Sequence, residues 1–352
     1  MLTDPTCLAA PAAGAMQLEL EMSGLAHPSA GALGEASPAG TRHYLAVASL
    51  TPDEFARLVS LARRMKREPG AWRDAIPGGK LAMLFDKPST RTRVSFEAAA
   101  VNLGMHPMML RPDELQIGRG EPPQDTARVL SRMVDAIAWR TFSQARMEAF
   151  AAVATIAVIN ALTDEHHPCQ ALADLMTIEE SVGSLAGHRL AYVGDGNNVA
   201  HSLLEAAALA GMHIVLASPE GYEPDAAIVA AARERAHETG GSIEIVHDPV
   251  EAVRGAEAVY TDVWTSMGEE AEREARRRAF AGYVVTSSLM EAAAPDAIFL
   301  HCLPAHRGEE VEEAVIEGRW SRVWDEAENR LWTEEAVLYA LITGDWRGDR
   351  AG

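Results

Sequence analysis

Basic residues are scarce in this 352-residue chain, and long apolar runs are absent. Lys and Arg total 31 against 51 Asp and Glu, so the formal net charge is −20. Such a charge repels the phosphates of nucleic acids and anionic lipid, so we expect neither as a partner. No apolar run approaches the roughly 20 residues of a membrane helix, so we expect no membrane span. An anionic ligand would need a local cluster of Arg and His.

Cysteine is also rare. Cys7, Cys169 and Cys302 are too few and too widely spaced for a disulfide framework or a paired zinc site, and a reducing compartment fits them best. The first Lys or Arg is Arg42, so the start of the chain resembles neither a secretory signal nor an Arg-rich transit peptide. These features predict a cytoplasmic protein.

The length of the chain fits two domains of roughly 150 residues each. Residues 1–41 are rich in Ala, Gly, Pro and Ser and contain no Lys or Arg, which predicts a flexible tail. The first helix is expected to begin at residues 51–54, where Thr51 is a suitable cap and Pro52 suits the first helical position.

Strand and helix patterns alternate after this point. Strands are expected at 81–85, 107–110, 136–139, 156–160, 190–193, 214–217, 243–246, 258–261 and 298–301. Helices are expected between them, among others at 91–103, 125–133, 143–152 (with Ser143 as its cap) and from 168 onwards. This order predicts an α/β protein with two domains, 42–180 and 181–330, each a parallel sheet flanked by helices. The ligand site should lie in the cleft between them, at the carboxyl ends of strands.

The C-terminal segment 331–352 contains an apolar-periodic pattern at 333–342 and no strand after it. We expect this helix to pack back on the first domain.

Residues 86–93 (Asp-Lys-Pro-Ser-Thr-Arg-Thr-Arg) lie between the first strand and the next helix. A helix N-terminus of this kind offers free backbone N–H groups, hydroxyl donors and the positive end of the helix dipole, all of which favour phosphate. Arg91 adds a planar group able to bind phosphate through two hydrogen bonds. The alternative is a capped helix with two surface arginines, and spacing alone does not decide between the two.

His167-Pro168-Cys169-Gln170 also begins a helix. His167 can donate to a carbonyl or phosphate oxygen, and Gln170 can accept from an amide; a simple helix cap is the alternative. Arg140 ends a strand at the same edge of the predicted sheet, where ligand-binding residues gather. A strand-ending Arg is otherwise usually solvated.

Two segments of the second half also follow strands. Residues 262–268 (Asp-Val-Trp-Thr-Ser-Met-Gly) offer a carboxylate, a hydroxyl and backbone groups suited to an amino-acid head group, or else form a loop that caps the next helix. Residues 301–304 (His-Cys-Leu-Pro) place a cysteine at a strand end, where it can face a cleft, although a buried structural Cys is more common.

Two more features leave alternatives open. Residues 194–198 (Gly-Asp-Gly-Asn-Asn) resemble a dinucleotide-binding fingerprint, but Val199 occupies the third glycine position, so we expect no NAD. Arg330 suits either another anion ligand or a surface helix cap.

In this order and spacing, Ser-Thr-Arg-Thr (89–92), His-Pro-Cys-Gln (167–170), Asp-x-x-x-Ser-Met-Gly (262–268) and His-Cys-Leu-Pro (301–304) resemble the ornithine carbamoyltransferases. The resemblance runs from about residue 42 to about residue 341 and includes 125–130 and 326–330. Aspartate carbamoyltransferases share the first segment but resemble neither of the last two. The resemblance implies transfer of the carbamoyl group of carbamoyl phosphate to the side-chain amine of L-ornithine, in arginine biosynthesis.

The resemblance also implies a role for each matching residue. Arg91 and Cys302 would be the catalytic residues. Carbamoyl phosphate would be bound by Ser89, Thr90, Arg91, Thr92, Arg140, His167, Pro168, Cys169, Gln170, Cys302, Leu303, Arg330 and Gln116 of the partner subunit. Ornithine would be bound by Asn198, Asp262, Ser266 and Met267. The family implies a homotrimer or a multiple of trimers and requires neither a metal nor an organic cofactor.

Three rival functions fit the sequence less well. A sister enzyme acting on putrescine or an N-acylated ornithine would not need Asp262 and Ser266, which suit a free α-ammonium group. A non-catalytic homologue is disfavoured because every expected ligand position holds a competent residue. A dehydrogenase-like nucleotide binder is disfavoured by Val199.

Overall fold

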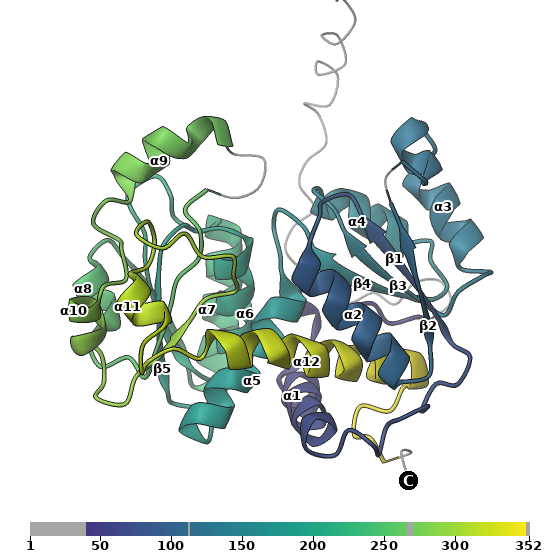
Figure 1. Cartoon of the computed structure of the whole chain (residues 1–352), viewed down its shortest axis with the longest axis horizontal. Coiled ribbons are helices and arrows are strands. Elements are labelled where there is room, and N and C mark those ends of the chain that lie inside the picture. Colours follow the sequence, from purple (N-terminus) through teal and green to yellow (C-terminus); the bar gives the residue numbers. More distant parts are fainter. Residues whose placement is uncertain (1–39, 112, 266–269, 350–352) are drawn as a thin grey trace, which may run out of the picture. The chain divides into compact units, whose positions relative to one another are not determined.

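The computed structural model describes residues 40–349 except 112 and 266–269. Two sheets organise these residues, and all of their pairings are parallel. The first sheet has the strand order β2-β1-β3-β4 and the second β7-β6-β5-β8-β9. Figure 1 shows helices against both sheets, so the expected fold class, two parallel-sheet domains flanked by helices, is confirmed.

The first domain is built from β1 and its neighbours. Its strands are β1 (Lys80–Phe85), β2 (His106–Leu110), β3 (Ala136–Arg140) and β4 (Ala157–Leu162). Its helices are α1 (Pro52–Arg67), α2 (Thr90–Asn102), α3 (Pro123–Leu130), α4 (Gln144–Ala151) and α5 (Pro168–Val182), with short 3-10 turns η1 (Val47–Ser49) and η2 (Gln116–Arg119). Successive residues of β1 belong to two different hydrophobic cores. Leu81 and Met83 pack in the core that also contains residues of α1 and α2, whereas Ala82 and Leu84 pack in the core that also contains residues of α3 and α4. The strand is therefore covered on both faces, which explains its unbroken apolar sequence.

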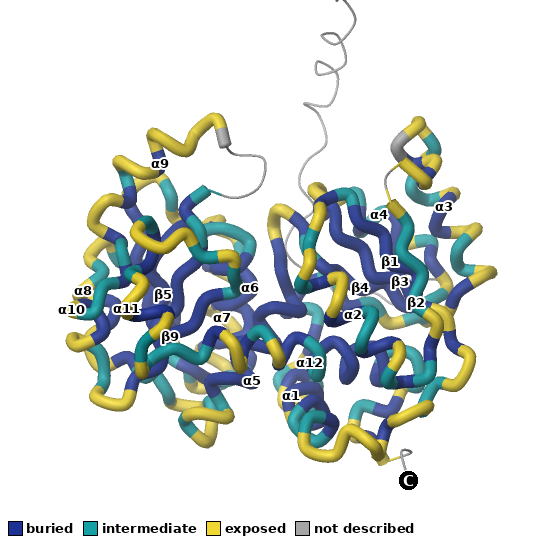
Figure 2. The backbone as a smooth tube through the Cα atoms, in the orientation of Figure 1, coloured by how far each residue is buried: buried dark blue, intermediate teal, exposed yellow. Residues whose placement is uncertain are grey.

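The second domain repeats this plan. Its strands are β5 (Arg189–Val193), β6 (His213–Ala217), β7 (Ser242–Val246), β8 (Ala258–Tyr260) and β9 (Ile298–Leu300). Its helices are α6 (Asn198–Ala210), α7 (Ala226–Thr239), α8 (Pro249–Val253), α9 (Arg273–Ala279), α10 (Ser287–Glu291) and α11 (Glu313–Ile316), with the 3-10 turn η3 (Glu270–Glu272). In β5, Leu190 and Tyr192 join the core with α6, whereas Ala191 and Val193 join the core with α8 and α10. Figure 2 shows the resulting buried strands inside each domain.

Helix α12 (Val323–Thr343) packs against α1, α2 and α5 and also contacts β9. It therefore returns the chain from the second domain to the first. The predicted helix at 333–342 is the C-terminal half of α12. The sequence-based start was wrong by ten residues because polar side chains such as Glu326, Asn329 and Arg330 interrupt the apolar pattern, yet all three are buried.

Local start signals were read correctly at several helices. Thr51 and Glu54 form a reciprocal capping box with Pro52 at the first helical position, and Ser143 accepts from the backbone N–H of Arg146. Apart from the start of α12, the predicted strands and helices match observed ones with ends that differ by up to three residues; helix 125–133, for example, is Pro123–Leu130. The predicted tail 1–41 lies almost wholly outside the described residues. Among the described helices, none is long and apolar enough to cross a membrane.

Candidate active site

A cavity of about 980 Å³ lies where carboxyl ends of strands from both sheets meet. Arg140 ends β3 and Leu162 ends β4, while the segments after β1, β5, β8 and β9 provide the remaining walls. Of the predicted site residues, those lining the cavity are Ser89, Thr90, Arg91, Thr92, Arg140, His167, Gln170, Asn198, Asp262, Cys302, Leu303 and Arg330. The structure therefore brings most of the predicted residues together.

The N-terminus of α2 forms one wall. Ser89 caps the helix by accepting from the backbone N–H of Thr92 at 3.3 Å. Arg91 is half-buried, lines the cavity and donates to the carbonyl oxygen of Leu303, whereas Arg93 is exposed and pairs with Glu97. The alternative of two surface arginines is thus wrong for Arg91 and right for Arg93.

Leu303 shows how the segment after β9 reaches this wall. It has a positive φ of 59° and precedes Pro304 through a cis peptide bond. A non-glycine residue in this region is uncommon and is often found at functional sites. Its carbonyl oxygen accepts from Arg91 Nη2 at 2.5 Å. This bond joins α2 of the first domain to the second domain across the cavity.

Arg330 lies deepest and is only 2% exposed. Its guanidinium donates to Glu334 twice, to Gln170 Oε1 at 2.7 Å and to Thr92 Oγ1 at 3.2 Å. The alternative of a surface helix cap is wrong, because Arg330 is a buried residue within α12. The buried ion pair with Glu334 fixes the direction of the guanidinium.

Arg140 is 8% exposed, and its Nε has no hydrogen-bond partner among the described residues. Burial, together with the positive charges of Arg330 and Arg91, lowers the pKa of Arg140 to about 10. Burial likewise lowers the pKa of Arg91, with Arg330 acting in the same direction. Three guanidinium groups that repel one another, one of them with an unpartnered buried N–H, form a site suited to a polyanion.

His167 is the N-cap residue of α5, as the alternative expected, but its side chain makes no capping hydrogen bond and lines the cavity instead. Its backbone N–H donates to Ser202 Oγ, and its buried Nδ1 has no hydrogen-bond partner among the described residues. Burial lowers the pKa of His167 well below its ordinary value, and Arg330, Arg140 and Arg91 add to the effect. The imidazole is therefore neutral and can offer one N–H and one lone pair to a ligand.

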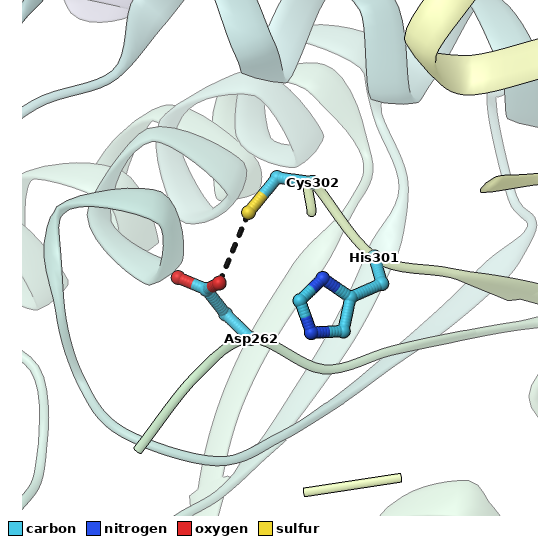
Figure 3. A group of neighbouring side chains, drawn as sticks. All are labelled: Asp262, His301 and Cys302. Carbon is cyan, nitrogen blue, oxygen red and sulfur yellow. Dashed lines mark hydrogen bonds between the residues drawn. The ribbon is translucent and has the colours of Figure 1, made fainter. Parts of the chain in front are cut away.

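The opposite wall carries Asp262 and Cys302. The Cys302 thiol donates to Asp262 Oδ1 at 3.0 Å, as Figure 3 shows, and Asn197 Nδ2 donates to Asp262 Oδ2 at 2.8 Å. Burial and the nearby carboxylate of Asp262 raise the pKa of the Cys302 thiol well above its ordinary value. Cys302 is half-buried, lines the cavity and carries a protonated thiol, so it is not the fully buried structural Cys of the alternative. The other alternative, a loop 262–268 that caps the next helix, stays open because residues 266–269 lie outside the described residues.

Two groups of described side chains come close enough to share a metal ion, Asp262 with His301 and Cys302, and His306 with Glu309 and Glu310. In the first group, His301 Nδ1 accepts from the backbone N–H of Leu303, and its Nε2 lies 3.2 Å from Glu310 Oε1. Both ring nitrogens thus already have partners. A metal here would have to displace bonds that shape the segment after β9.

Some predicted site residues lie elsewhere. Cys169 is fully buried with its thiol on the carbonyl oxygen of Asn160, and the Pro168 carbonyl oxygen accepts from Tyr44. Gln116 is exposed on η2 and does not line this chain's cavity. Ser266 and Met267 lie outside the described residues. The roles given to these five, like the roles given to the residues that line the cavity, stay predictions.

Two residues of the cavity wall, Arg276 and Lys87, were not predicted to belong to the site. Arg276, on α9, pairs with Asp195 at 2.9 Å and donates to the Trp264 carbonyl oxygen at 3.0 Å. It is one of three consecutive arginines, and only the fold distinguishes it from its neighbours. Lys87 is buried, pairs with Asp164 and stacks on the ring of Phe142. The one indication that Lys87 lies at the site was its position within residues 86–93, the segment predicted to bind phosphate.

Comparison with known proteins assigns both halves of the chain. Residues 42–180 match the carbamoyl-phosphate-binding domain of the aspartate/ornithine carbamoyltransferases, and residues 186–341 match their aspartate/ornithine-binding domain. An ornithine carbamoyltransferase from Acidothermus cellulolyticus is 56% identical over 301 residues, which is 86% of this chain and 96% of that protein. The chain therefore belongs to the aspartate/ornithine carbamoyltransferase family.

Solved structures agree with this assignment. The ornithine carbamoyltransferase from Pyrococcus furiosus is 50% identical, with a TM-score of 0.83 over 86% of this chain and 97% of that one. The corresponding enzyme from Gloeobacter violaceus is 49% identical, with a TM-score of 0.78 over 86% of this chain and 99% of that one.

The arginine cluster leads to a prediction about anion binding. Replacing Arg140 with Met removes one of three mutually repelling charges. We expect Arg140→Met to melt no lower than the wild type without ligand, but to lose its stabilisation by inorganic phosphate. For the wild type this stabilisation should reach about 2.7 kcal/mol at 100 times the dissociation constant. Thermal melting with and without phosphate measures it, with Arg93→Met as the exposed control. An unchanged response of Arg140→Met to phosphate would contradict the assignment.

Proposed function

We propose that this chain transfers the carbamoyl group of carbamoyl phosphate to the side-chain amine of L-ornithine, giving L-citrulline and phosphate. The observation that carries the proposal is the convergence of Arg91, Arg140 and Arg330 on one cavity whose other wall holds Asp262 and Cys302. A dianion is thus bound beside a carboxylate able to receive an ammonium group. The relatives that share most of the chain's length are ornithine carbamoyltransferases.

The phosphate of the donor substrate would bind at the N-terminus of α2, where Ser89, Thr90, Arg91 and Thr92 meet Arg140. Positioned donors of this kind stabilise the charge that develops on phosphate as the bond to the carbamoyl group breaks. Each is typically worth about 2.7–4 kcal/mol of barrier in enzymes of acyl transfer. The fixed direction of Arg330 means that little reorganisation is needed when the charge develops.

The carbamoyl group would lie between His167, Gln170 and Arg330. Neutral His167 can donate to the carbamoyl oxygen, and Gln170 presents its own oxygen to the same region, where it already accepts from Arg330 at 2.7 Å. The carbamoyl carbon is thereby made more electrophilic, and the amide part is oriented for attack.

The α-amino and carboxylate groups of ornithine would bind on the second domain. Asp262 offers a carboxylate for the ammonium group. Asn198 Nδ2 donates to the Thr163 carbonyl oxygen at 2.6 Å, which leaves its second N–H and its amide oxygen for the substrate. Ser266 and Met267 are proposed to complete this part of the site. Putrescine lacks the α-ammonium group and would leave Asp262 without its partner.

The reaction then needs a neutral amine. A free alkylamine with a pKa near that of Lys, about 10.4, is neutral in only about one molecule in 10³ at pH 7. The adjacent guanidinium groups and the removal of water both lower the pKa of the bound amine. Cys302, as a protonated thiol bonded to Asp262, would orient the amine or relay its proton and form no covalent intermediate.

We further propose a homotrimer in which Gln116 of the partner subunit completes the phosphate site, since Gln116 is exposed and does not line the cavity of its own chain. Light scattering in solution tests the assembly, and a monomer would contradict it. The reaction is proposed to serve arginine biosynthesis in the cytoplasm, where the free thiols of Cys169 and Cys302 would stay reduced.

The acceptor specificity is the direct test of the proposed function. Citrulline and related products would be measured with carbamoyl phosphate and, in parallel, ornithine, aspartate, putrescine or N-acetylornithine. We expect ornithine to be used with by far the highest kcat/KM, because it alone combines a free α-ammonium group for Asp262 with a side-chain amine. Preferred turnover of another acceptor would overturn the proposal.

Removal of the thiol separates binding from chemistry. Cys302→Ala should bind carbamoyl phosphate like the wild type while kcat falls, by up to about 10²–10⁴-fold if a proton is relayed through this residue. Calorimetric titration measures the binding, and citrulline formation measures kcat. Isolation of a carbamoyl-cysteine from the wild type would contradict the non-covalent role.

The pH dependence should report the substrate amine. His167 has a lowered pKa and stays neutral, and Cys302 has a raised pKa and stays a thiol, so neither changes charge between pH 7 and 8. Among the groups that face the reacting atoms, the ornithine amine alone then changes its charge, because Asp174, with its pKa raised to about 7, does not line the cavity. The kcat/KM for ornithine should therefore rise about tenfold over this interval. Binding of carbamoyl phosphate should stay constant over the same interval, since Arg140 remains charged up to its pKa of about 10. A maximum near neutral pH would point instead to a titrating group of the protein.

A further inference from the structure

Directly behind the carbamoyl part of the cavity lies a buried acid that accepts hydrogen bonds from three different elements. Glu326, on α12 and 1% exposed, receives Gln170 Nε2 at 3.0 Å, the Tyr260 hydroxyl at 3.2 Å and the backbone N–H of His301 at 2.9 Å. These donors come from α5, β8 and the segment after β9. Glu326 thus connects the first domain to the ends of the neighbouring strands β8 and β9 of the second.

The contact with Gln170 determines which end of its amide faces the ligand. Gln170 Nε2 donates to Glu326 and also to Asp174 Oδ1 at 2.7 Å, which uses both of its N–H groups. The amide oxygen is therefore the end that points to Arg330. With the amide reversed, Gln170 would turn its N–H groups toward Arg330 and its oxygen toward two carboxyl groups, a poor arrangement at both ends.

The contact with His301 fixes the segment that carries Cys302 and Leu303. The backbone N–H of His301 is the last donor before Cys302, and Leu303 turns back to accept from Arg91. The Glu326 carboxyl group therefore positions both the Gln170 amide, which binds the carbamoyl group, and the Cys302 thiol, which lies next to the attacking amine.

We infer that Glu326 is a positioning residue for carbamoyl transfer, which acts by accepting from Gln170, Tyr260 and His301 at once. This inference rests on the proposed function. Glu326 touches neither substrate directly, because it does not line the cavity.

The neighbouring acid Asp174 accepts fewer hydrogen bonds than Glu326. Asp174 Oδ1 accepts from Gln170, and its Oδ2 has no hydrogen-bond partner among the described residues. Burial raises the pKa of Asp174 to about 7, and burial together with Asp174 raises that of Glu326 well above its usual range. Asp174 therefore needs to accept only from Gln170. An amide can replace Asp174, since its oxygen accepts and its N–H donates.

An amide cannot replace Glu326 in the same way, because its NH2 group cannot accept from Gln170, Tyr260 or His301. We expect Glu326→Gln to lower kcat/KM for carbamoyl phosphate by about 10²-fold, the effect of a small misplacement of reacting groups. Asp174→Asn should stay close to the wild type. The exposed acid Asp325 on the same helix provides the matched control, Asp325→Asn, which should equal the wild type.

Citrulline formation by the full-length enzyme would be measured for all variants at saturating ornithine, with circular dichroism to establish folding. Equal activity of Glu326→Gln and Asp174→Asn, whether both high or both low, would overturn the inference, since a merely structural acid pair predicts such symmetry. If Glu326→Gln does not fold, Tyr260→Phe removes a single donor to Glu326 and decides: a lowered kcat/KM supports the inference and an unchanged one refutes it. A wild type without citrulline formation would instead refute the proposed function itself.

Discussion

Mutual repulsion of three guanidinium groups is the constraint on which the rest of this structure depends. Arg91, Arg140 and Arg330 share one cavity in a chain whose formal net charge is −20. Within the part of the chain that the structure describes, Arg330 alone of the three pairs with a carboxylate, the buried Glu334, and the pKa of Arg140 falls to about 10. The fold keeps these charges together at a cost that a bound dianion relieves, so the energy of anion binding is built into the folded chain.

Three separate parts of the fold hold the charges together. Arg91 begins α2, Arg140 ends β3 and Arg330 lies in the middle of α12. Parallel sheets place the first two at the same edge because their strands run in the same direction. Helix α12 supplies the third by returning from the second domain to the first, and its position next to β9 also lets Glu326 reach the backbone before Cys302. The same helix therefore links the phosphate part of the site to the amine part.

The sequence was most informative where local rules apply. Segments 86–93, 167–170 and 301–304 follow or precede regular elements, so their positions at strand ends and helix starts could be predicted, and the structure brings their side chains to one cavity. The sequence was least informative where a long-range contact decides. Nothing local distinguishes the buried Arg330 from a surface arginine, or Arg276 from the two arginines that follow it. Nothing local predicts the left-handed backbone of Leu303 either. Its carbonyl oxygen accepts from Arg91 of the first domain, which is a long-range contact.

A crystal structure with carbamoyl phosphate and an ornithine analogue that lacks the side-chain amine would show whether the three arginines bind a phosphate beside the ornithine site. We expect the phosphate within hydrogen-bond distance of Arg91, Arg140 and the N-terminus of α2. We expect the carbamoyl group against His167, Gln170 and Arg330, and the analogue's ammonium group on Asp262 with its side chain directed toward Cys302. A phosphate bound elsewhere, or an analogue seated away from Asp262 and Cys302, would contradict this expectation.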